Sequence, residues 1–352
     1  MAPIKLTING KTIEAQSGQT VLEVARAAGI YIPTLCYHHA LPPEGACRMC
    51  LVEIEKQRSL QPACTFPATE GLIIHTHSPK VEATRKFTLE MLISDHPLDC
   101  MTCDATGDCR LQDLAYQYQV QGGKYPRSEN HNPMETVNPL IVRDFSRCIL
   151  CGRCVQACNE VQVNRAISFG YRGVAAKVVA GADVPLKDSQ CVFCGECVQA
   201  CPTAALTEKK ARFVWRPWKN RKVRTTCPYC GVGCQQWLHV QDDRIVKVTG
   251  VEDGAPNKGR LCVKGRFGYD FIYSDERLKT PLIREGDDFR EASWDEALDL
   301  VADKFKTIIA ESGPDAVAGV SCARSINEDS YQMQKLFRAV IGTNNIDHCA
   351  RT

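Results

Sequence analysis

The first residues of the chain alternate apolar and polar side chains in a way that predicts a small α/β unit. Residues 4–8 have the period of a half-buried strand, and the Asn-Gly pair at 9–10 is a two-residue hairpin signal before a second strand. Thr20 and Glu23 have the spacing of a capping box, which predicts a helix over 21–28.

Later segments change to the helical period. Residues 81–95 read as one helix, and residues 295–309 and 329–341 as two more, with a buried-strand run at 316–320 between them. The last three segments indicate the start of an α/β domain. No partner strand is evident for the single strand, so we expect the apolar faces of this unit to lie open.

Composition narrows the class of protein. The chain has 352 residues and a formal net charge of +2, from 43 basic and 41 acidic residues. This balance gives no reason to expect nucleic acid or an anionic membrane as a partner. The sequence has no run of about 18 apolar residues and no signal-peptide pattern at its N-terminus, so we expect no membrane span and a cytoplasmic location.

The 21 cysteines are the exceptional feature. In a cytoplasmic chain such a number indicates metal binding, and disulfide frameworks have no need of the repeated Cys-x2-Cys spacing. Four cysteines can hold a [2Fe–2S] cluster or structural zinc, and both readings stay open for a single set. We expect five iron–sulfur clusters, because the sequence contains five complete ligand sets.

The first two sets lie in the N-terminal third. One has the spacing of a [2Fe–2S] site and follows the predicted hairpin and helix, which suits a β-grasp ferredoxin fold: Cys36, Cys47, Cys50 and Cys64. The other combines a histidine at a helix end with three thiolates for a [4Fe–4S] cluster: His96, Cys100, Cys103 and Cys109. A neutral imidazole in place of a thiolate makes that cluster less negative.

The next two sets form an internal repeat with the spacing of bacterial ferredoxins, in which the fourth cysteine of each run ligates the other cluster. One [4Fe–4S] cluster is therefore assigned to Cys148, Cys151, Cys154 and Cys201. The other is assigned to Cys191, Cys194, Cys197 and Cys158. Asn159 replaces the proline of the pattern without removing a ligand.

The fifth set has four thiolates for a further [4Fe–4S] cluster: Cys227, Cys230, Cys234 and Cys262. Lys264 follows two residues later, either as a surface charge or as a relay between this cluster and a second redox group.

The basic and aromatic residues 210–224 are interpreted as a solvated connector with two packing tryptophans. Cys322 and Cys349 are interpreted as inert, partly buried thiols, and the chain has no Gly-x-Gly-x-x-Gly or Walker fingerprint.

This order of motifs resembles the N-terminal part of a formate dehydrogenase of the molybdenum- or tungsten-bispterin class. Complex I and iron hydrogenases share the first segments. The tail supports the formate dehydrogenase resemblance through Ala323-Arg324, Asn327-Glu328, Tyr331, Gln334-Lys335, Gly342-Thr343-Asn344-Asn345 and His348-Cys349-Ala350-Arg351-Thr352. The resemblance implies formate/CO2 interconversion by the parent enzyme at a Mo or W bis(pyranopterin guanine dinucleotide). It also implies Lys264 as cofactor-binding electron relay.

The partners that the resemblance implies are a flavin- and NAD(P)-binding iron–sulfur subunit, hydrogenase subunits or ferredoxin. The alternative is a non-catalytic electron-transfer subunit of a hydrogenase or complex I-like assembly. In the family the residue after Ala350-Arg351-Thr352 is the cysteine or selenocysteine that ligates the metal. We therefore expect no catalytic residue within the chain, and interpret its end as a selenocysteine codon read as a stop or as a break.

The expected fold class is multi-domain α+β. A [2Fe–2S] β-grasp domain (1–78) precedes a one-His/three-Cys [4Fe–4S] domain (79–120) and a double [4Fe–4S] ferredoxin-like domain (138–210). A linker rich in Gly, Pro and Asn (121–139) joins the one-His/three-Cys domain to the double ferredoxin-like domain. A [4Fe–4S] Mo/W-bispterin domain (222–278) and the incomplete start of a molybdopterin oxidoreductase α/β domain (279–352) complete the chain.

Overall fold

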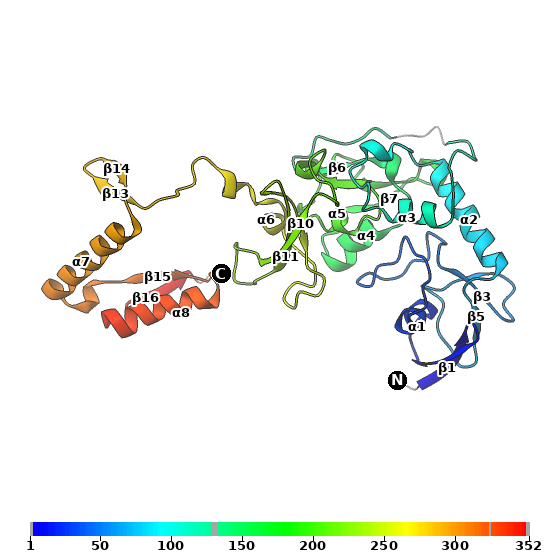
Figure 1. The fold of residues 1–352 in the computed structure, drawn as a ribbon, viewed down its shortest axis with the longest axis horizontal. Helices are drawn as coiled ribbons and strands as arrows, with labels where there is room; N and C mark the ends of the chain where they lie inside the picture. Colours follow the sequence, from blue (N-terminus) through cyan, green and yellow to red (C-terminus); the bar gives the residue numbers. More distant parts are fainter. Residues whose placement is uncertain (1–2, 128–131, 324, 350–352) are drawn as a thin grey trace. The chain divides into compact units, whose positions relative to one another are not determined.

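The computed structural model describes residues 3–127, 132–323 and 325–349. The chain divides into two compact units, the first comprising residues 1–221 with 239–247 and the second residues 222–238 with 248–352. Figure 1 shows the order of the elements along the chain.

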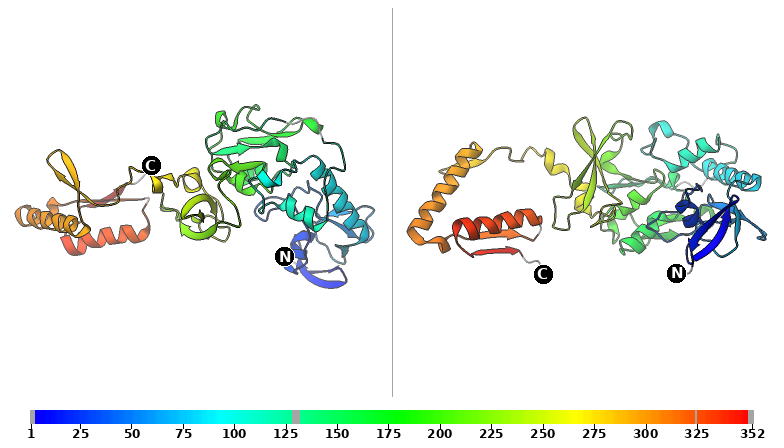
Figure 2. Two further views of the ribbon diagram at one scale, coloured as in Figure 1. Left: turned by 45° about the horizontal axis from the view of Figure 1, so that its top comes forward. Right: turned by 60° about the horizontal axis from the view of Figure 1, so that its bottom comes forward.

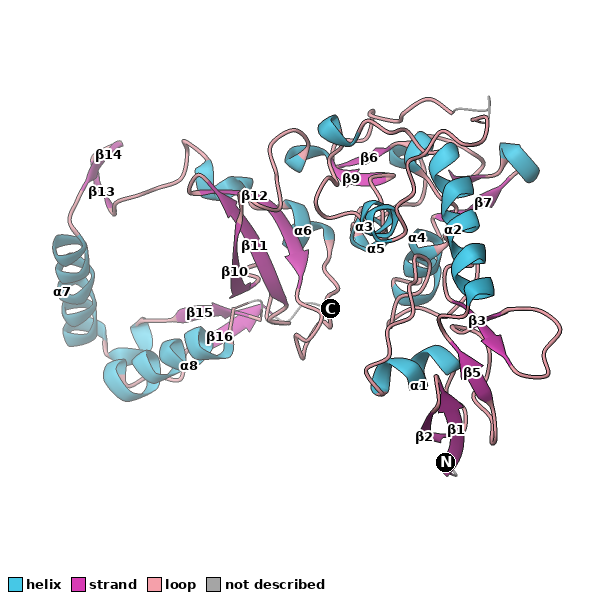
Figure 3. Cartoon of the chain, turned by 45° about the vertical axis from the view of Figure 1, so that its right-hand side comes forward, coloured by secondary structure: helices cyan, strands magenta, loops and turns pink. Residues whose placement is uncertain are grey.

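The N-terminal domain is a mixed five-stranded sheet in the order β2-β1-β5-β3-β4 with helix α1 beside it, a β-grasp arrangement (Figure 3). β1 pairs antiparallel with β2 and parallel with β5. Thr20 caps α1 in a complete capping box with Glu23, as predicted. The elements are β1 (Pro3–Ile8), β2 (Lys11–Gln16), α1 (Val21–Ala27), β3 (Leu51–Ile54), β4 (Gln61–Pro62) and β5 (Ile73–His75).

The core of this domain consists of apolar side chains from both layers, and two predicted cluster ligands lie among them. Leu6, Ile8, Leu22 and Ile74 are at most 2% exposed. The strand residues Leu6, Ile8 and Ile74 fix the register of the sheet, because a one-residue slip would expose them. Cys50 and Cys64 belong to the same core.

The one-His/three-Cys segment is helical. Ser78 caps α2 and a proline occupies its first turn, so the helix begins two residues earlier than the period predicts. The elements are α2 (Pro79–Ser94), η1 (Cys100–Thr102) and α3 (Arg110–Gln117).

The double-ferredoxin segment has two short helices, each preceded by a glycine in the left-handed region, Gly152 and Gly195. Two small antiparallel sheets, β6-β9 and β7-β8, flank these helices. The elements are β6 (Ile141–Arg143), η2 (Phe145–Arg147), α4 (Arg153–Gln156), η3 (Ala157–Val161), β7 (Ile167–Gly170), η4 (Gly173–Ala175), β8 (Lys177–Ala180), η5 (Leu186–Asp188), α5 (Glu196–Ala200), β9 (Leu206–Glu208) and η6 (Lys209–Ala211).

The sheet β10-β11-β12 contributes to both units, because residues 239–247 group with the first. The second unit ends in α7 and a β-α-β segment, in which β15, α8 and β16 lie together in every view (Figures 1 and 2). The elements are β10 (Arg221–Thr226), β11 (Gln235–Gln241), β12 (Arg244–Gly250), α6 (Val263–Phe267), η7 (Asp270–Tyr273), β13 (Leu282–Glu285), β14 (Asp288–Glu291), α7 (Trp294–Ser312), η8 (Pro314–Ala316), β15 (Gly319–Cys322), α8 (Asn327–Lys335), η9 (Leu336–Ile341) and β16 (Ile346–Cys349).

Three interpretations from the sequence need correction. The strand predicted over 316–320 lies at Gly319–Cys322, because Pro314 starts a 3-10 turn. This strand has a partner, since β16 pairs with it in parallel. The connector 210–224 buries only one of its two tryptophans: Trp215 is 6% exposed and packs with Ala211 and Val246, whereas Trp218 is 61% exposed.

No helix among the described residues is both long and apolar enough to cross a membrane. Arg324 and Ala350-Arg351-Thr352, which contribute to the resemblance in the tail, lie outside the described residues, as does the side chain of Cys349.

Candidate iron–sulfur centres

The four cysteines of the first set lie together at one end of the β-grasp sheet. The Cys36 amide donates to Cys47 Sγ at 3.3 Å, and the sulfurs of Cys50 and Cys64 are 3.4 Å apart. All four are at most 7% exposed. Hydrogen bonds from the Cys47 and Cys64 thiols lower the pKa of Cys36 far below its usual value. A hydrogen bond with Cys64 also lowers the pKa of Cys50. Four converging thiols, two of them with a lowered pKa, suit a [2Fe–2S] cluster or another metal that prefers thiolates.

His96 follows α2, and its amide donates to the Ile93 carbonyl at 3.2 Å. Its Nδ1 lies 2.9 Å from the Pro97 carbonyl oxygen, so Nδ1 carries the proton. Nε2 is buried and has no hydrogen-bond partner among the described residues. Burial lowers the pKa of His96, which keeps the ring neutral. A neutral imidazole with an orphaned, buried lone pair is the arrangement expected of a metal ligand.

The three cysteines of the second set surround the turn between η1 and α3. Burial raises the pKa of Cys109 to about 11, and Cys103 and Cys100 raise it further by their proximity. Cys103 and His96 share two charged neighbours, Asp99 and Arg147, which influence the pKa of both. The structure therefore places the three thiols close together. His96 and Cys103 both lie near the ion pair of Asp99 and Arg147.

Cys201, the fourth cysteine of the second run, lies near the first three cysteines of the first run, and the crossover assignment stays a prediction. Burial and then Cys201 raise the pKa of Cys151 to about 12, and Cys201 also acts on Cys148 and Cys154. These four cysteines line one cavity together with Cys197, which is assigned to the other cluster, and with apolar side chains: Ile167, Val178, Leu186 and Leu206. The cavity supplies sulfur ligands in an apolar enclosure, as a [4Fe–4S] cluster requires.

The second site of the repeat is built in the same way. Cys158 raises the pKa of Cys191 by its proximity, after the larger effect of burial. The Ala166 amide donates to Cys158 Sγ at 3.3 Å, and the Phe193 amide to Cys191 Sγ at 3.4 Å. Amide donors to ligand sulfurs tune the potential of iron–sulfur clusters.

The fifth set lies wholly in the second unit. The Cys227 amide donates to the Cys234 carbonyl at 2.8 Å, which closes the first loop. Burial, followed by Cys227, Cys230 and Cys262, raises the pKa of Cys234, so the four sulfurs are neighbours. A Cβ on Gly265 would lie 3.4 Å from Cys227 Sγ, so the small residue leaves room for the sulfur.

Lys264 lies in α6, the helix that Cys262 precedes. The side chain is exposed, and its own carbonyl accepts from the Gly268 amide at 2.8 Å. An exposed ammonium two residues from a predicted ligand can face a second redox group, and the exposure alone is equally compatible with a surface charge. The role of Lys264 stays a prediction.

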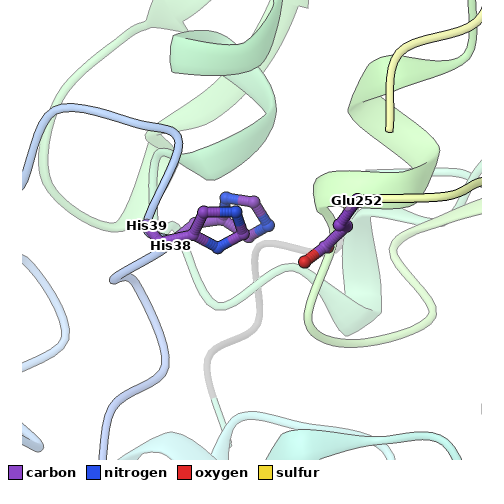
Figure 4. Close-up of side chains that lie close together, drawn as sticks. All are labelled: His38, His39 and Glu252. Carbon is purple, nitrogen blue, oxygen red and sulfur yellow. The ribbon is translucent and has the colours of Figure 1, made fainter. Parts of the chain in front are cut away.

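Sequence reasoning missed two kinds of residue. His38 and His39 follow the first ligand closely and stack at a centroid distance of 4.5 Å (Figure 4). Glu252, which Figure 4 also labels, belongs to the second unit. Arg85 and Arg147 also contact segments that carry predicted ligands. No sequence pattern indicates these contacts, because Leu51 and Asp99 are distant in the chain from the arginines that they bind.

Family comparisons agree with this sequence of modules. Residues 1–79 match the 2Fe-2S iron-sulfur cluster binding domain, residues 85–123 the NADH-ubiquinone oxidoreductase-G iron-sulfur binding region, and residues 147–205 the 4Fe-4S dicluster domain. Residues 220–274 match the molybdopterin oxidoreductase Fe4S4 domain, and 277–352 match molybdopterin oxidoreductase. The modules define an iron–sulfur electron-transfer protein that leads into a molybdopterin oxidoreductase domain.

Relatives carry several names. A subunit of NADH-quinone oxidoreductase from Rhizobium meliloti and the alpha subunit of NADPH-Fe(3+) oxidoreductase from Geobacter sulfurreducens are each 40% identical over 99% of this chain. A Staphylococcus aureus protein provisionally named as a formate dehydrogenase is 33% identical over 98% of it. The chain spans about 40% of the length of these relatives.

A solved structure, that of an NAD+-reducing [NiFe]-hydrogenase in the H2-reduced state, includes a chain that is 34% identical to this one. The match has a TM-score of 0.57 and covers 61% of this chain and 91% of that chain. The protein therefore belongs to the family of iron–sulfur electron-transfer modules found in molybdopterin oxidoreductases and in NADH-quinone oxidoreductases.

Proposed function

We propose that the chain is the iron–sulfur electron-transfer portion of a formate dehydrogenase that works as formate oxidase or CO2 reductase. The observation that carries the proposal is the succession of five ligand sets that ends in the Fe4S4 and α/β domains of molybdopterin oxidoreductases. Two observations support formate as the substrate: the resemblance of the tail to formate dehydrogenases, and the name of the Staphylococcus aureus relative.

Bound clusters supply one-electron acceptors and donors. The chain's own residues hold them: His96 offers a neutral nitrogen, and nineteen cysteines offer thiolates in the sets described above. Apolar packing shields five of these cysteines from water, because they belong to one hydrophobic core: Cys36, Cys47, Cys103, Cys109 and Cys151. In this proposal Lys264 holds a positive charge between the Cys227 set and a Mo or W bispterin cofactor, which favours the arrival of electrons.

The partner proposed is a flavin- and NAD(P)-binding iron–sulfur subunit, with hydrogenase subunits or ferredoxin as other candidates for the same role. Names among the relatives support a nicotinamide-linked assembly, because they include a subunit of NADH-quinone oxidoreductase and an NAD+-reducing hydrogenase. The same names support the second candidate function, a non-catalytic electron-transfer subunit of such an assembly.

The test uses the full-length gene product, purified without oxygen. The proposal expects about 18 iron atoms per chain, for one [2Fe–2S] and four [4Fe–4S] clusters, and stoichiometric Mo or W with pterin. Formate should bleach the visible absorption of the clusters within the time of turnover. Full iron without Mo, W or pterin, and no response to formate, would favour the electron-transfer subunit. Stoichiometric zinc in place of iron would refute both.

A further inference from the structure

Arg147 joins the two segments that carry the ligands of neighbouring candidate clusters. Its Nη1 and Nη2 donate to the two carboxylate oxygens of Asp99, at 2.9 and 2.7 Å. Such a two-bond pairing fixes orientation as well as distance. Asp99 directly precedes Cys100, and Arg147 directly precedes Cys148. The ion pair therefore links the one-His/three-Cys segment to the double-ferredoxin segment.

The double-ferredoxin segment holds the arginine rigidly. Arg147 Nε donates to Asp144 Oδ2 at 2.8 Å, and Asp144 Oδ1 accepts from the amide and hydroxyl of Ser146. The Thr203 hydroxyl, two residues beyond Cys201, donates to the Arg147 carbonyl at 2.9 Å. The guanidinium thus has a fixed position set by two ligand-bearing loops of one site.

The positive charge acts on the one-His/three-Cys site. The guanidinium is bonded to the carboxylate of Asp99, which directly precedes Cys100, so it lies beside a ligand loop of that site. The Arg147 side chain is only 11% exposed. Water and salt therefore screen its field weakly. A fixed cation near a cluster stabilises the reduced form, which carries one more negative charge.

We propose that Arg147 is a positioning residue that raises the reduction potential of the cluster held by His96, Cys100, Cys103 and Cys109. The inference rests on the proposed function, because it needs that cluster. Reduction adds one electron to the cluster and changes no bond of Arg147. The carboxylates of Asp99 and Asp144, which both pair with Arg147, oppose part of the effect and orient the guanidinium.

Three substitutions in the full-length protein separate charge from geometry, each followed by an EPR-monitored redox titration. Arg147→Gln removes the charge and should lower the midpoint potential of the one-His cluster by ~59 mV, a tenfold change in the one-electron reduction equilibrium. Arg147→Lys keeps the charge and should stay near the wild-type value. Asp99→Asn removes one opposing charge while keeping the shape, and should raise the potential.

Controls keep the outcomes distinct. The [2Fe–2S] potential serves as an internal reference, and Arg172→Gln removes an exposed arginine of the same unit with no expected shift. An unchanged one-His potential in Arg147→Gln with full iron content would overturn the inference. If Arg147→Gln does not fold, an unchanged potential in Asp99→Asn overturns it equally. A wild-type protein that lacks the one-His cluster signal refutes the proposed function instead.

Discussion

Arg85 Nη2 donates a 2.7 Å hydrogen bond to the carbonyl oxygen of Leu51, the residue after Cys50. The Arg85 side chain is entirely buried, and Nη1 also pairs with Glu82 at 3.2 Å. A cation from α2 is thus fixed to the ligand loop of the [2Fe–2S] domain. A buried hydrogen bond therefore joins the β-grasp domain to the one-His/three-Cys segment.

Replacing Arg85 should weaken that junction. Arg85→Met removes a charged donor and leaves the Leu51 carbonyl without its partner, which should cost about 1.5–3 kcal/mol of unfolding free energy. Urea unfolding followed by far-ultraviolet circular dichroism measures the loss. Lys86→Met is the matched control, because Lys86 is the exposed neighbour on the same helix. Equal midpoints for both variants would contradict the prediction.

Gly152 is a second sensitive position in the first unit. Its φ is +79°, and an added Cβ would overlap the carboxylate of Glu44, the residue just before Gly45 in the [2Fe–2S] loop. Gly152→Ala should therefore displace Glu44 and reduce the iron content of the Cys148 site. Iron analysis with EPR measures this. Gly173→Ala is the control, since it has a similar positive φ but open space around it; comparable iron loss in both variants would mean that backbone strain alone is responsible.

His96 gives the sharpest test of a single ligand. His96→Cys should retain a cluster and lower its midpoint potential, because an anionic thiolate replaces a neutral imidazole. His96→Ala should lose or alter one [4Fe–4S] signal. His75→Ala, outside every ligand set, should change nothing. EPR spectra and potentials of His96→Ala identical to wild type would show that the histidine is not a ligand.

The proposed role of Lys264 is tested in the full-length gene product, with formate as the electron donor that the proposed function requires. Lys264→Gln should leave the iron content unchanged and slow the reduction of the clusters by formate at least about tenfold, or 1.4 kcal/mol in the barrier. Stopped-flow absorbance measures the rate. Lys279→Gln removes another exposed lysine of the second unit and serves as control. A wild-type rate in Lys264→Gln would leave the lysine a surface charge.

Iron removal should affect the domains of the first unit unequally. The β-grasp domain has its own core of Leu6, Ile8, Leu22 and Ile74, so it should stay folded without iron. The double-ferredoxin segment depends on helices of four and five residues, α4 and α5, which need their ligands to be held. Limited proteolysis after chelation should cut within 138–210 first. Simultaneous cleavage of both domains would contradict this difference.

The sequence predicted best where local chemistry decides the structure. The capping box of Thr20 and Glu23 places the start of α1, and the spacing of the repeat places Cys201 with Cys148. Regular cysteine spacing predicts ligands without knowledge of the fold. The modules that it defines agree with the family matches along the chain.

Prediction failed where partners are distant in the chain. β3 has four residues and β5 has three, too few to show a clear period, and β5 pairs with β1 on one side and with β3 on the other. The parallel pairing of β15 with β16 requires the crossover through α8, which periodicity alone does not reveal. Arg85 and Arg147 are ordinary charged residues in the sequence, and only packing identifies their roles.

Cysteines from three ligand sets, Cys36 and Cys47, Cys103 and Cys109, and Cys151, share one hydrophobic core. Packing in this shared core couples the three sites, so we expect the loading of one site to favour the loading of its neighbours. A cell short of iron would then accumulate chains that are incompletely matured at all three sites together.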